Sequence, residues 1–173
     1  MTQADTDTGA ADILGGFPAF RPLAPWWGGD LQTLRNFVAA QRGLRPAIGA
    51  ERIHLEMLYE RGDRLGASLT RAPDNDKPLV LLIHGLSGCE GSMHMIHAAR
   101  YHASRGHSVL RLNLRGAGPS RSTCRGDYHA GCSRDLADAL TSLAALDPDH
   151  IANGVLLSGV SLGGSLVSKF LAD

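Results

Sequence analysis

Hydrophobic and polar positions divide the chain into an irregular N-terminal region and a regular remainder. Residues 52–59 alternate apolar and polar side chains with the two-residue period of a half-buried strand, and residues 61–64 turn the chain into a second strand at 65–70. These segments predict an antiparallel hairpin. The run Leu79–Ile83 is continuously apolar, which is typical of a central strand covered on both faces.

Beyond this central strand the pattern alternates between helix and strand. Apolar residues at helical spacing predict helices over 92–105, 133–146 and 165–171, and apolar runs between them predict strands over 108–113 and 151–157. Strands and helices in strict succession imply a parallel sheet with right-handed crossovers. We therefore predict an α/β domain over residues 49–173, with a mostly parallel sheet entered by an antiparallel hairpin.

Residues 1–48 follow no such pattern and are predicted to form an arm and a short helix. Residues 17–27 hold three prolines and both tryptophans, which excludes a regular helix and indicates an extended arm. Asp30 is a candidate N-cap for a helix that continues to Val38.

Composition excludes several classes of protein. The chain carries 17 basic and 17 acidic side chains, so its net charge recruits neither nucleic acid nor an anionic membrane. No apolar run approaches the length of a bilayer span, and residues 1–12 do not have the pattern of a signal peptide. We therefore expect no integral membrane segment. Cys89, Cys124 and Cys132 lack metal-ligand spacing and are expected to be reduced thiols of a cytoplasmic protein without metal or cofactor. The oligomeric state stays open.

The strongest chemical signal is the pentapeptide Gly159-Val160-Ser161-Leu162-Gly163, which has the Gly-x-Ser-x-Gly form of a nucleophile elbow. An elbow holds a serine on a tight turn between a strand and a helix, and the flanking segments have those two patterns. Ser161 is therefore the predicted nucleophile of a serine hydrolase. A serine here argues against a dehalogenase, which would use an aspartate. The alternative is a glycine-rich loop with an incidental serine.

A second signal is the loop His84-Gly85-Leu86-Ser87-Gly88, which directly follows the predicted central strand. In folds built around a serine elbow, this loop supplies one backbone donor of the oxyanion hole. We assign that role to the Leu86 N–H, with the Leu162 N–H as the second donor. Phosphate cradling is disfavoured, because neither nucleotide-binding glycine motif is present. His84 is expected to orient the loop, and a role as general base is the less favoured alternative.

Other candidate residues have weaker signals. His94 and His97 lie three positions apart on a predicted helix, but no third metal ligand accompanies them, so an exposed helix face is the better interpretation. His129 is expected to be structural. The arginines between Arg105 and Arg134 could steer an anionic substrate, but solvation or pairing with local carboxylates is the favoured interpretation.

Several motifs together resemble the YheT-like (ABHD-type) branch of the α/β-hydrolases. They are Trp26-Trp27, Asp30-Leu31-Gln32-Thr33-Leu34, His84-Gly85-Leu86-Ser87-Gly88, Asn113-Leu114-Arg115-Gly116, Tyr128-His129-Ala130-Gly131 with Asp135-Leu136, and Gly159-Val160-Ser161-Leu162-Gly163-Gly164. The resemblance begins near Phe17 and covers nearly all of the remaining chain. It implies an α/β-hydrolase fold, a Ser-Asp-His triad on an eight-stranded sheet, and a small-molecule acyl ester as substrate, since members are regarded as carboxylesterases and are similar to eukaryotic proteins that act on acylglycerols.

The sequence departs from this pattern by ending one helix after Ser161. In the elbow fold, the acid and the histidine follow the serine, so the triad Asp and His are expected to be absent from this chain. On this hypothesis residues 49–173 are an incomplete α/β-hydrolase core, truncated after the elbow helix and inactive alone. The alternative is a non-catalytic, truncated α/β-hydrolase-like protein. The strand at 151–157 is then expected at the sheet margin, where an uncovered edge favours aggregation or oligomers.

Overall fold

The computed structural model describes residues 21–41 and 49–173, which belong to two compact units divided between Leu44 and Arg45. In the first unit, residues 21–28 are irregular and precede α1 (Gly29–Gln41). The helix predicted from Asp30 to Val38 is therefore confirmed, with a longer C-terminal end. The N-cap role of Asp30 is wrong, because the helix already begins at Gly29 and Asp30 lies in its first turn. Residues 17–20 of the predicted arm lie outside the described residues.

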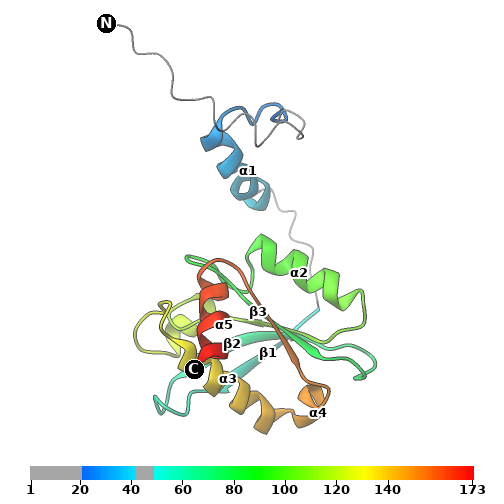
Figure 1. Ribbon diagram of the computed structural model, residues 1–173, viewed down its shortest axis with the longest axis vertical. Helices are drawn as coiled ribbons and strands as arrows, with labels where there is room; N and C mark the ends of the chain where they lie inside the picture. The colour runs from blue at the N-terminus through cyan, green and yellow to red at the C-terminus, as the bar shows by residue number, and fades with distance from the viewer. Residues whose placement is uncertain (1–20, 42–48) are drawn as a thin grey trace, which may run out of the picture. The chain divides into compact units, whose positions relative to one another are not determined.

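The second unit contains a mixed sheet with helices on both faces (Figure 1). Among the described residues the strands are β1 (Glu51–Glu56), β2 (Arg64–Thr70), β3 (Leu79–Ile83), β4 (Val109–Leu112) and β5 (Val155–Gly159), in the order β1-β2-β4-β3-β5. β3 is parallel to β4 and β5, whereas β2 is antiparallel to β1 and β4. The predicted fold class, a parallel core with an antiparallel entry hairpin, is confirmed.

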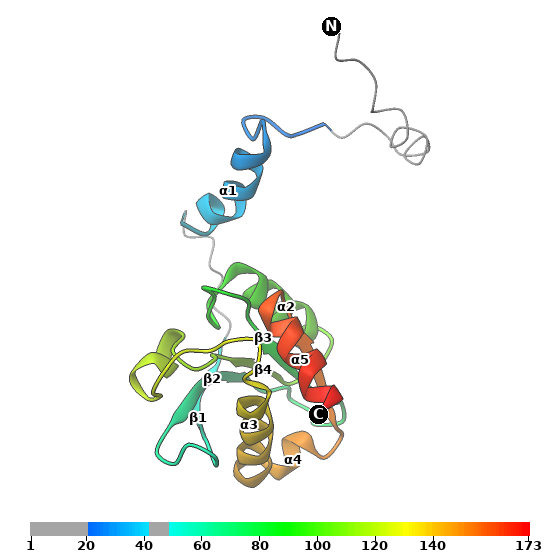
Figure 2. The ribbon, with the colours of Figure 1, turned by 60° about the vertical axis from the view of Figure 1, so that its left-hand side comes forward.

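The helices follow the predicted alternation. They are α2 (Met93–Ala103), the 3-10 helix η1 (Gly118–Ser122), α3 (Ser133–Leu146), α4 (Pro148–Ile151) and α5 (Leu162–Ala172). α3 and α5 pack against each other on one face of the sheet, and α2 contacts β3 and β4 on the other (Figure 2). No helix within the described residues is long and apolar enough to cross a bilayer.

The central strand β3 is buried on both faces, as its unbroken apolar run predicts. Leu79, Leu81 and Ile83 belong to the larger core, which includes buried residues of α3 and α5. Val80 and Leu82 belong to a smaller cluster with residues of α2 and β4. Each such side chain contributes about 2 kcal/mol on removal from water, so this strand is a firm base for the loop that follows it.

The face of the sheet that carries α2 becomes polar near β2. The carboxylate of Glu90 accepts hydrogen bonds from Ser68 Oγ at 2.8 Å, Asn113 Nδ2 at 2.7 Å and the Arg52 guanidinium. Burial alone would raise the pKa of Glu90, but these hydrogen bonds hold that pKa below its usual value. Glu90 thus anchors the segment between β3 and α2 to the neighbouring strands.

One predicted strand is wrong at its start. Residues 148–151 form α4 instead, because Pro148 suits the first turn of a helix, and the chain then turns at Gly154 into β5. η1 was also not predicted. β5 lies at one end of the described sheet, as expected for this strand, and pairs there with β3.

Candidate active site

Ser161 occupies a sharp turn between β5 and α5, at the carboxyl end of the parallel strands. Its backbone has φ 54° and ψ −120°, which a residue other than glycine adopts at a cost of about 1–3 kcal/mol. Hydrogen bonds hold both sides of the turn, because Val160 N–H donates to Ile83 O at 3.1 Å and Ser165 N–H donates to Ser161 O at 3.1 Å. The Ser161 side chain is exposed. This is the strained and accessible geometry that an elbow gives to its serine.

The two glycines of the pentapeptide are required by close backbone contacts. A Cβ atom on Gly159 would lie 2.3 Å from the carbonyl carbon and oxygen of Gly163. A Cβ atom on Gly163 would lie 2.6 Å from the carbonyl oxygens of Ile83 and His84. Both distances are far shorter than van der Waals contact, so the turn can form only with glycine at these positions.

The loop after β3 packs directly against the serine. A Cβ atom on Gly85 would lie 3.0 Å from Val160 O and 3.1 Å from Ser161 Cβ. The structure thus brings together the two segments that the sequence singled out, although they are more than 70 residues apart.

Within the described part of the chain, the N–H groups of Leu86 and Leu162 have no hydrogen-bond acceptor. Leu162 is the first residue of α5, where helix geometry leaves N–H groups unpaired, and the helix dipole adds partial positive charge. Leu86 follows Gly85, which contacts the serine. The assignment of these two amides to an oxyanion hole stays a prediction, and their free donors are compatible with it.

Tyr128 holds the loop in place from the segment before α3. Its hydroxyl oxygen accepts a hydrogen bond from Ser87 N–H at 2.7 Å, and its O–H group donates to Gly85 O at 3.4 Å. Ser87 itself has φ 56°, so this contact supports a second strained position. No role for Tyr128 was predicted, because a contact between residues 41 positions apart leaves no local pattern.

His84 is fully buried and uses both ring nitrogens. Leu114 N–H donates to Nε2 at 3.1 Å, so Nε2 carries no proton, and Nδ1–H therefore donates to Gly85 O at 2.8 Å. The predicted orienting role is confirmed by these bonds. The alternative, a general base for Ser161, is wrong in this arrangement, since neither nitrogen is free to accept the serine proton.

Residues 78–173 match the family model described as alpha/beta hydrolase fold. The chain belongs to this family. Solved structures with the same fold include an esterase from Pyrococcus furiosus, at 17% identity and a TM-score of 0.59, covering 72% of this chain and 47% of that chain. Est1E from Butyrivibrio proteoclasticus with bound ferulic acid matches at 20% identity and a TM-score of 0.57, covering 69% of this chain and 47% of that chain.

The alpha/beta hydrolase GrgF from a Penicillium species matches at 20% identity and a TM-score of 0.63, covering 72% of this chain and 42% of that chain. The chain spans about half the length of these structures. Identities this low establish the fold alone, and the YheT-like branch stays a prediction.

The burial of His84 predicts a pH dependence for the stability of the chain. Burial lowers the pKa of His84 below its ordinary value near 6.5, so the unfolded chain binds the proton first as pH falls. The stability is therefore fully present above pH 6.5 and is lost as pH falls toward the folded-state pKa. We expect urea unfolding between pH 7.5 and 5.5 to show this loss, and a shallower pH dependence in His84→Gln.

The pKa values of His94 and His102 are also lowered, by partial desolvation against neighbouring residues even though the surface of His94 is exposed. Both histidines remain in the wild type and in His84→Gln, so the difference in slope isolates His84. Parallel pH profiles for the wild type and His84→Gln would contradict the assignment of a neutral, buried imidazole.

The other histidines singled out by the sequence lie away from these bonds. His94 and His97 are exposed on α2, as predicted. His129 Nδ1 accepts a hydrogen bond from Gly131 N–H at 3.0 Å, which stabilises the turn before α3 and agrees with a structural role. Among the described residues, no group of three His, Cys, Asp or Glu side chains could hold a metal ion, and the three cysteines are free.

Arg115 is the centre of a buried ion cluster rather than a free cation. Its guanidinium pairs side-on with Asp135, at 3.0 Å from Nε and 2.7 Å from Nη2, and also bonds to Glu60 at 2.8 Å and to Asp63. The Asp135 hydrogen bonds, followed by the other carboxylates, raise the pKa of Arg115 above its usual value despite its burial. The predicted pairing with local carboxylates is confirmed here. The cluster joins the end of β4 to the β1–β2 turn and to α3.

Proposed function

We propose that Ser161 is the nucleophile of a serine hydrolase that acts on carboxylic esters. The observation that carries this proposal is the positive φ of Ser161 at the turn between β5 and α5. A serine kept in this costly conformation, exposed and flanked by two obligatory glycines, favours a role for its hydroxyl over an incidental loop. The fold shared with a solved esterase supports the substrate class.

In this mechanism, Ser161 Oγ attacks the carbonyl carbon of the ester while its proton passes to a general base. The carbonyl oxygen becomes an oxyanion, which accepts hydrogen bonds from the Leu86 and Leu162 N–H groups. Collapse of the tetrahedral intermediate expels the alcohol, which takes up the proton, and water then hydrolyses the acyl-serine by the same steps. Each oriented donor typically contributes about 3 kcal/mol to transition-state stabilisation.

The proposal assigns the general base to a histidine, oriented by an acid, that is outside the described contacts of Ser161. Within the described residues, no histidine nitrogen has a hydrogen bond to Ser161. The matched structures are about twice the length of this chain, which supports a further segment as the source. The competing possibility is a protein that keeps the fold without catalysing a reaction. It is supported by the same observation, that no described histidine is bonded to Ser161.

Added imidazole tests the proposal on the 173-residue chain. Without imidazole, we expect p-nitrophenyl acetate turnover to be equal in the wild type and Ser161→Ala, since no histidine among the described residues is bonded to the serine. With imidazole present, turnover by the wild type is expected to exceed that of Ser161→Ala about tenfold, because the free base replaces part of the general-base effect. Peptide mass spectrometry should then find the acetyl group on Ser161.

Ser168→Ala is the matched control, since Ser168 is exposed on the same helix and is expected to keep the imidazole-dependent rate. Circular dichroism of each variant confirms the fold. An imidazole-dependent rate that is identical in wild type and Ser161→Ala, with no acetyl group on Ser161, would favour the non-catalytic alternative.

A further inference from the structure

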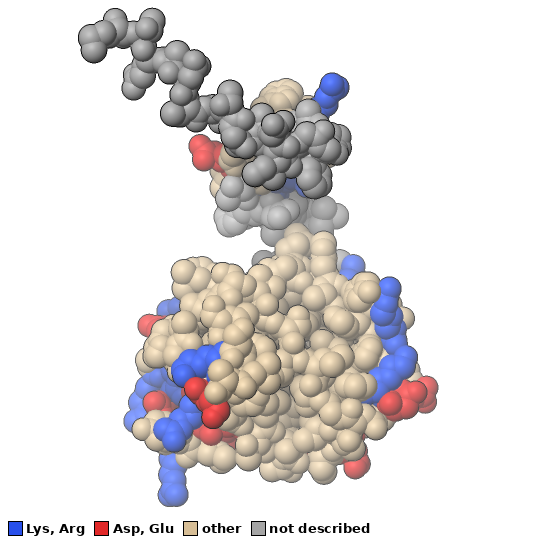
Figure 3. All heavy atoms as spheres, viewed as in Figure 1, with Lys and Arg blue, Asp and Glu red and all other residues tan. Residues whose placement is uncertain are grey.

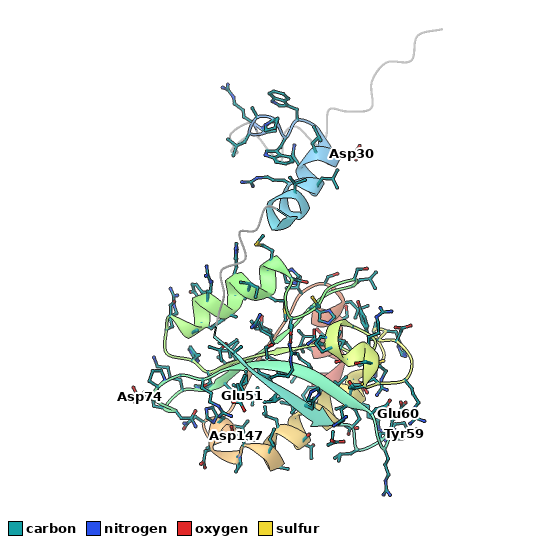
Figure 4. The ribbon with its side chains drawn as sticks, turned by 180° about the vertical axis from the view of Figure 1, so that it is seen from behind. Asp30, Glu51, Tyr59, Glu60, Asp74 and Asp147 are labelled. Carbon is teal, nitrogen blue, oxygen red and sulfur yellow. The ribbon has the colours of Figure 1, made fainter. Side chains whose placement is uncertain are left out.

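A polar cavity of about 420 Å³ opens between the β1–β2 turn and the segment that follows η1. It lies beside the Arg115 cluster, near the turn where Figure 4 labels Tyr59 and Glu60. Figure 3 shows basic side chains at this end of the sheet with acidic side chains among them. The volume is within the range of about 300–1,000 Å³ that is usual for small-molecule sites.

Hydrogen bonds between the two segments fix the walls of the cavity. Arg64 N–H donates to Thr123 O at 2.9 Å, and Arg64 O accepts bonds from Thr123 Oγ1 at 2.6 Å and Cys124 Sγ at 3.0 Å. Arg125 N–H donates to Asp63 Oδ2 at 3.2 Å. A ligand would therefore meet a frame that is already ordered, which lowers the entropic cost of binding.

Three arginines line this frame, Arg61, Arg64 and Arg125, and all three are exposed. Within the described residues, the side chains of Arg61 and Arg64 have no acceptor, and Arg125 uses only Nε, at 3.2 Å from Asp63 Oδ1. Most of their N–H donors are therefore available to a ligand.

Asp63 is the one carboxylate that lines the cavity, and it is already neutralised. Its side chain is buried and bonded to the guanidinium groups of both Arg115 and Arg125. Burial alone would raise the pKa of Asp63, but the Arg125 N–H and the two guanidiniums hold that pKa below its usual value. Glu60, which lies within the β1–β2 turn, is paired with Arg115. The cavity is therefore positively charged at neutral pH.

We propose that this cavity is a binding site for the phosphate group of a small phosphate monoester. Guanidinium groups present parallel N–H donors that match phosphate oxygens. Three of them on one frame suit a doubly charged phosphate ligand better than they suit a ligand with a single carboxylate. The preformed backbone and the spare donors together distinguish this cavity from a scattering of solvated arginines.

The site is separate from Ser161. β2 is antiparallel to β4, so the β1–β2 turn lies beyond the carboxyl ends of the parallel strands, as the serine turn does. The strand order places β4 and β3 between β2 and β5, a separation of about 14 Å at roughly 4.8 Å per strand. The proposal does not depend on the proposed ester chemistry, and the two can fail independently.

Glycerol 3-phosphate and inorganic phosphate are the probes for this site. Isothermal titration calorimetry of the full chain at constant ionic strength is expected to show saturable binding of both anions. Chloride is expected to show no saturable binding. In the double variant Arg61→Gln/Arg64→Gln, affinity should fall at least tenfold, because two of the three guanidiniums are lost. Arg100→Gln, which removes an exposed arginine from α2, should bind like the wild type.

Two results would overturn the proposal. One is binding no stronger than that of chloride. The other is equal affinity in the wild type and the double variant, which would place the anion elsewhere. Equal unfolding midpoints for the double variant and the wild type would show that lost binding is not lost folding, since both arginines are exposed. If the double variant unfolds earlier, the single variants Arg61→Gln and Arg64→Gln replace it, and each is expected to weaken binding in part.

Discussion

Replacement of Arg115 by methionine is expected to lower the free energy of unfolding by about 3–5 kcal/mol. The substitution preserves much of the side-chain volume but removes the cation that pairs with Asp135, Asp63 and Glu60. Asp63 is buried, so its carboxylate would be left in a poorly solvated place with only Arg125 as a partner. Urea unfolding followed by circular dichroism at pH 7 measures the effect.

Two further variants separate charge from geometry. Arg115→Lys keeps the charge but cannot form the side-on pair with Asp135, so we expect an intermediate loss. Arg125→Gln removes an exposed partner of the same Asp63 carboxylate and should cost about 1 kcal/mol or less. Equal losses for Arg115→Met and Arg125→Gln would show that burial of the ion pair is unimportant.

Substitution of Gly163 by alanine is the second change expected to have a large effect. The new methyl group would lie 2.6 Å from two backbone carbonyl oxygens, those of Ile83 and His84, which cannot move without disturbing β3. Overpacking of this kind typically costs about 1–3 kcal/mol, and a clash with backbone belongs at the upper end of that range. The midpoint of urea unfolding is the measurement.

Gly91→Ala is the matched control for Gly163→Ala. A Cβ atom on Gly91 would meet only Cys89 Sγ, at an ordinary contact distance of 3.7 Å, and we expect a change within about 0.5 kcal/mol. Stability of Gly163→Ala close to that of Gly91→Ala would mean that the turn can relax, and the steric argument for the elbow would be lost.

Local patterns were sufficient for most of the fold. β3 was predicted from its apolar run, because a strand buried on both faces can carry only such residues. The region 148–154 was misjudged, because apolar Ile151 resembles the first residue of a strand when it is read without the helical turn begun by Pro148.

The candidate site was predictable where its chemistry is local. Ser161 and the loop after β3 have sequence patterns of their own, and the structure brings them into contact. The role of Tyr128 and the bonds of Arg115 to Glu60 and Asp63 were not predictable, since these hydrogen bonds join residues distant in sequence and leave no local pattern. The positions of the supporting side chains are therefore a property of the packed fold.

The hydrogen bond from Ser87 N–H to Tyr128 also restricts the stereochemistry of the proposed reaction. Since this amide is occupied, the Ser87 N–H is not available to an anion, which leaves the preceding Leu86 N–H to serve as the donor in the proposed mechanism. If the Leu86 and Leu162 N–H groups hold the carbonyl oxygen as proposed, its orientation relative to Ser161 Oγ would be fixed and one face of the ester would be presented to the nucleophile. A tyrosine that never touches the substrate would in this way determine the handedness of the tetrahedral intermediate.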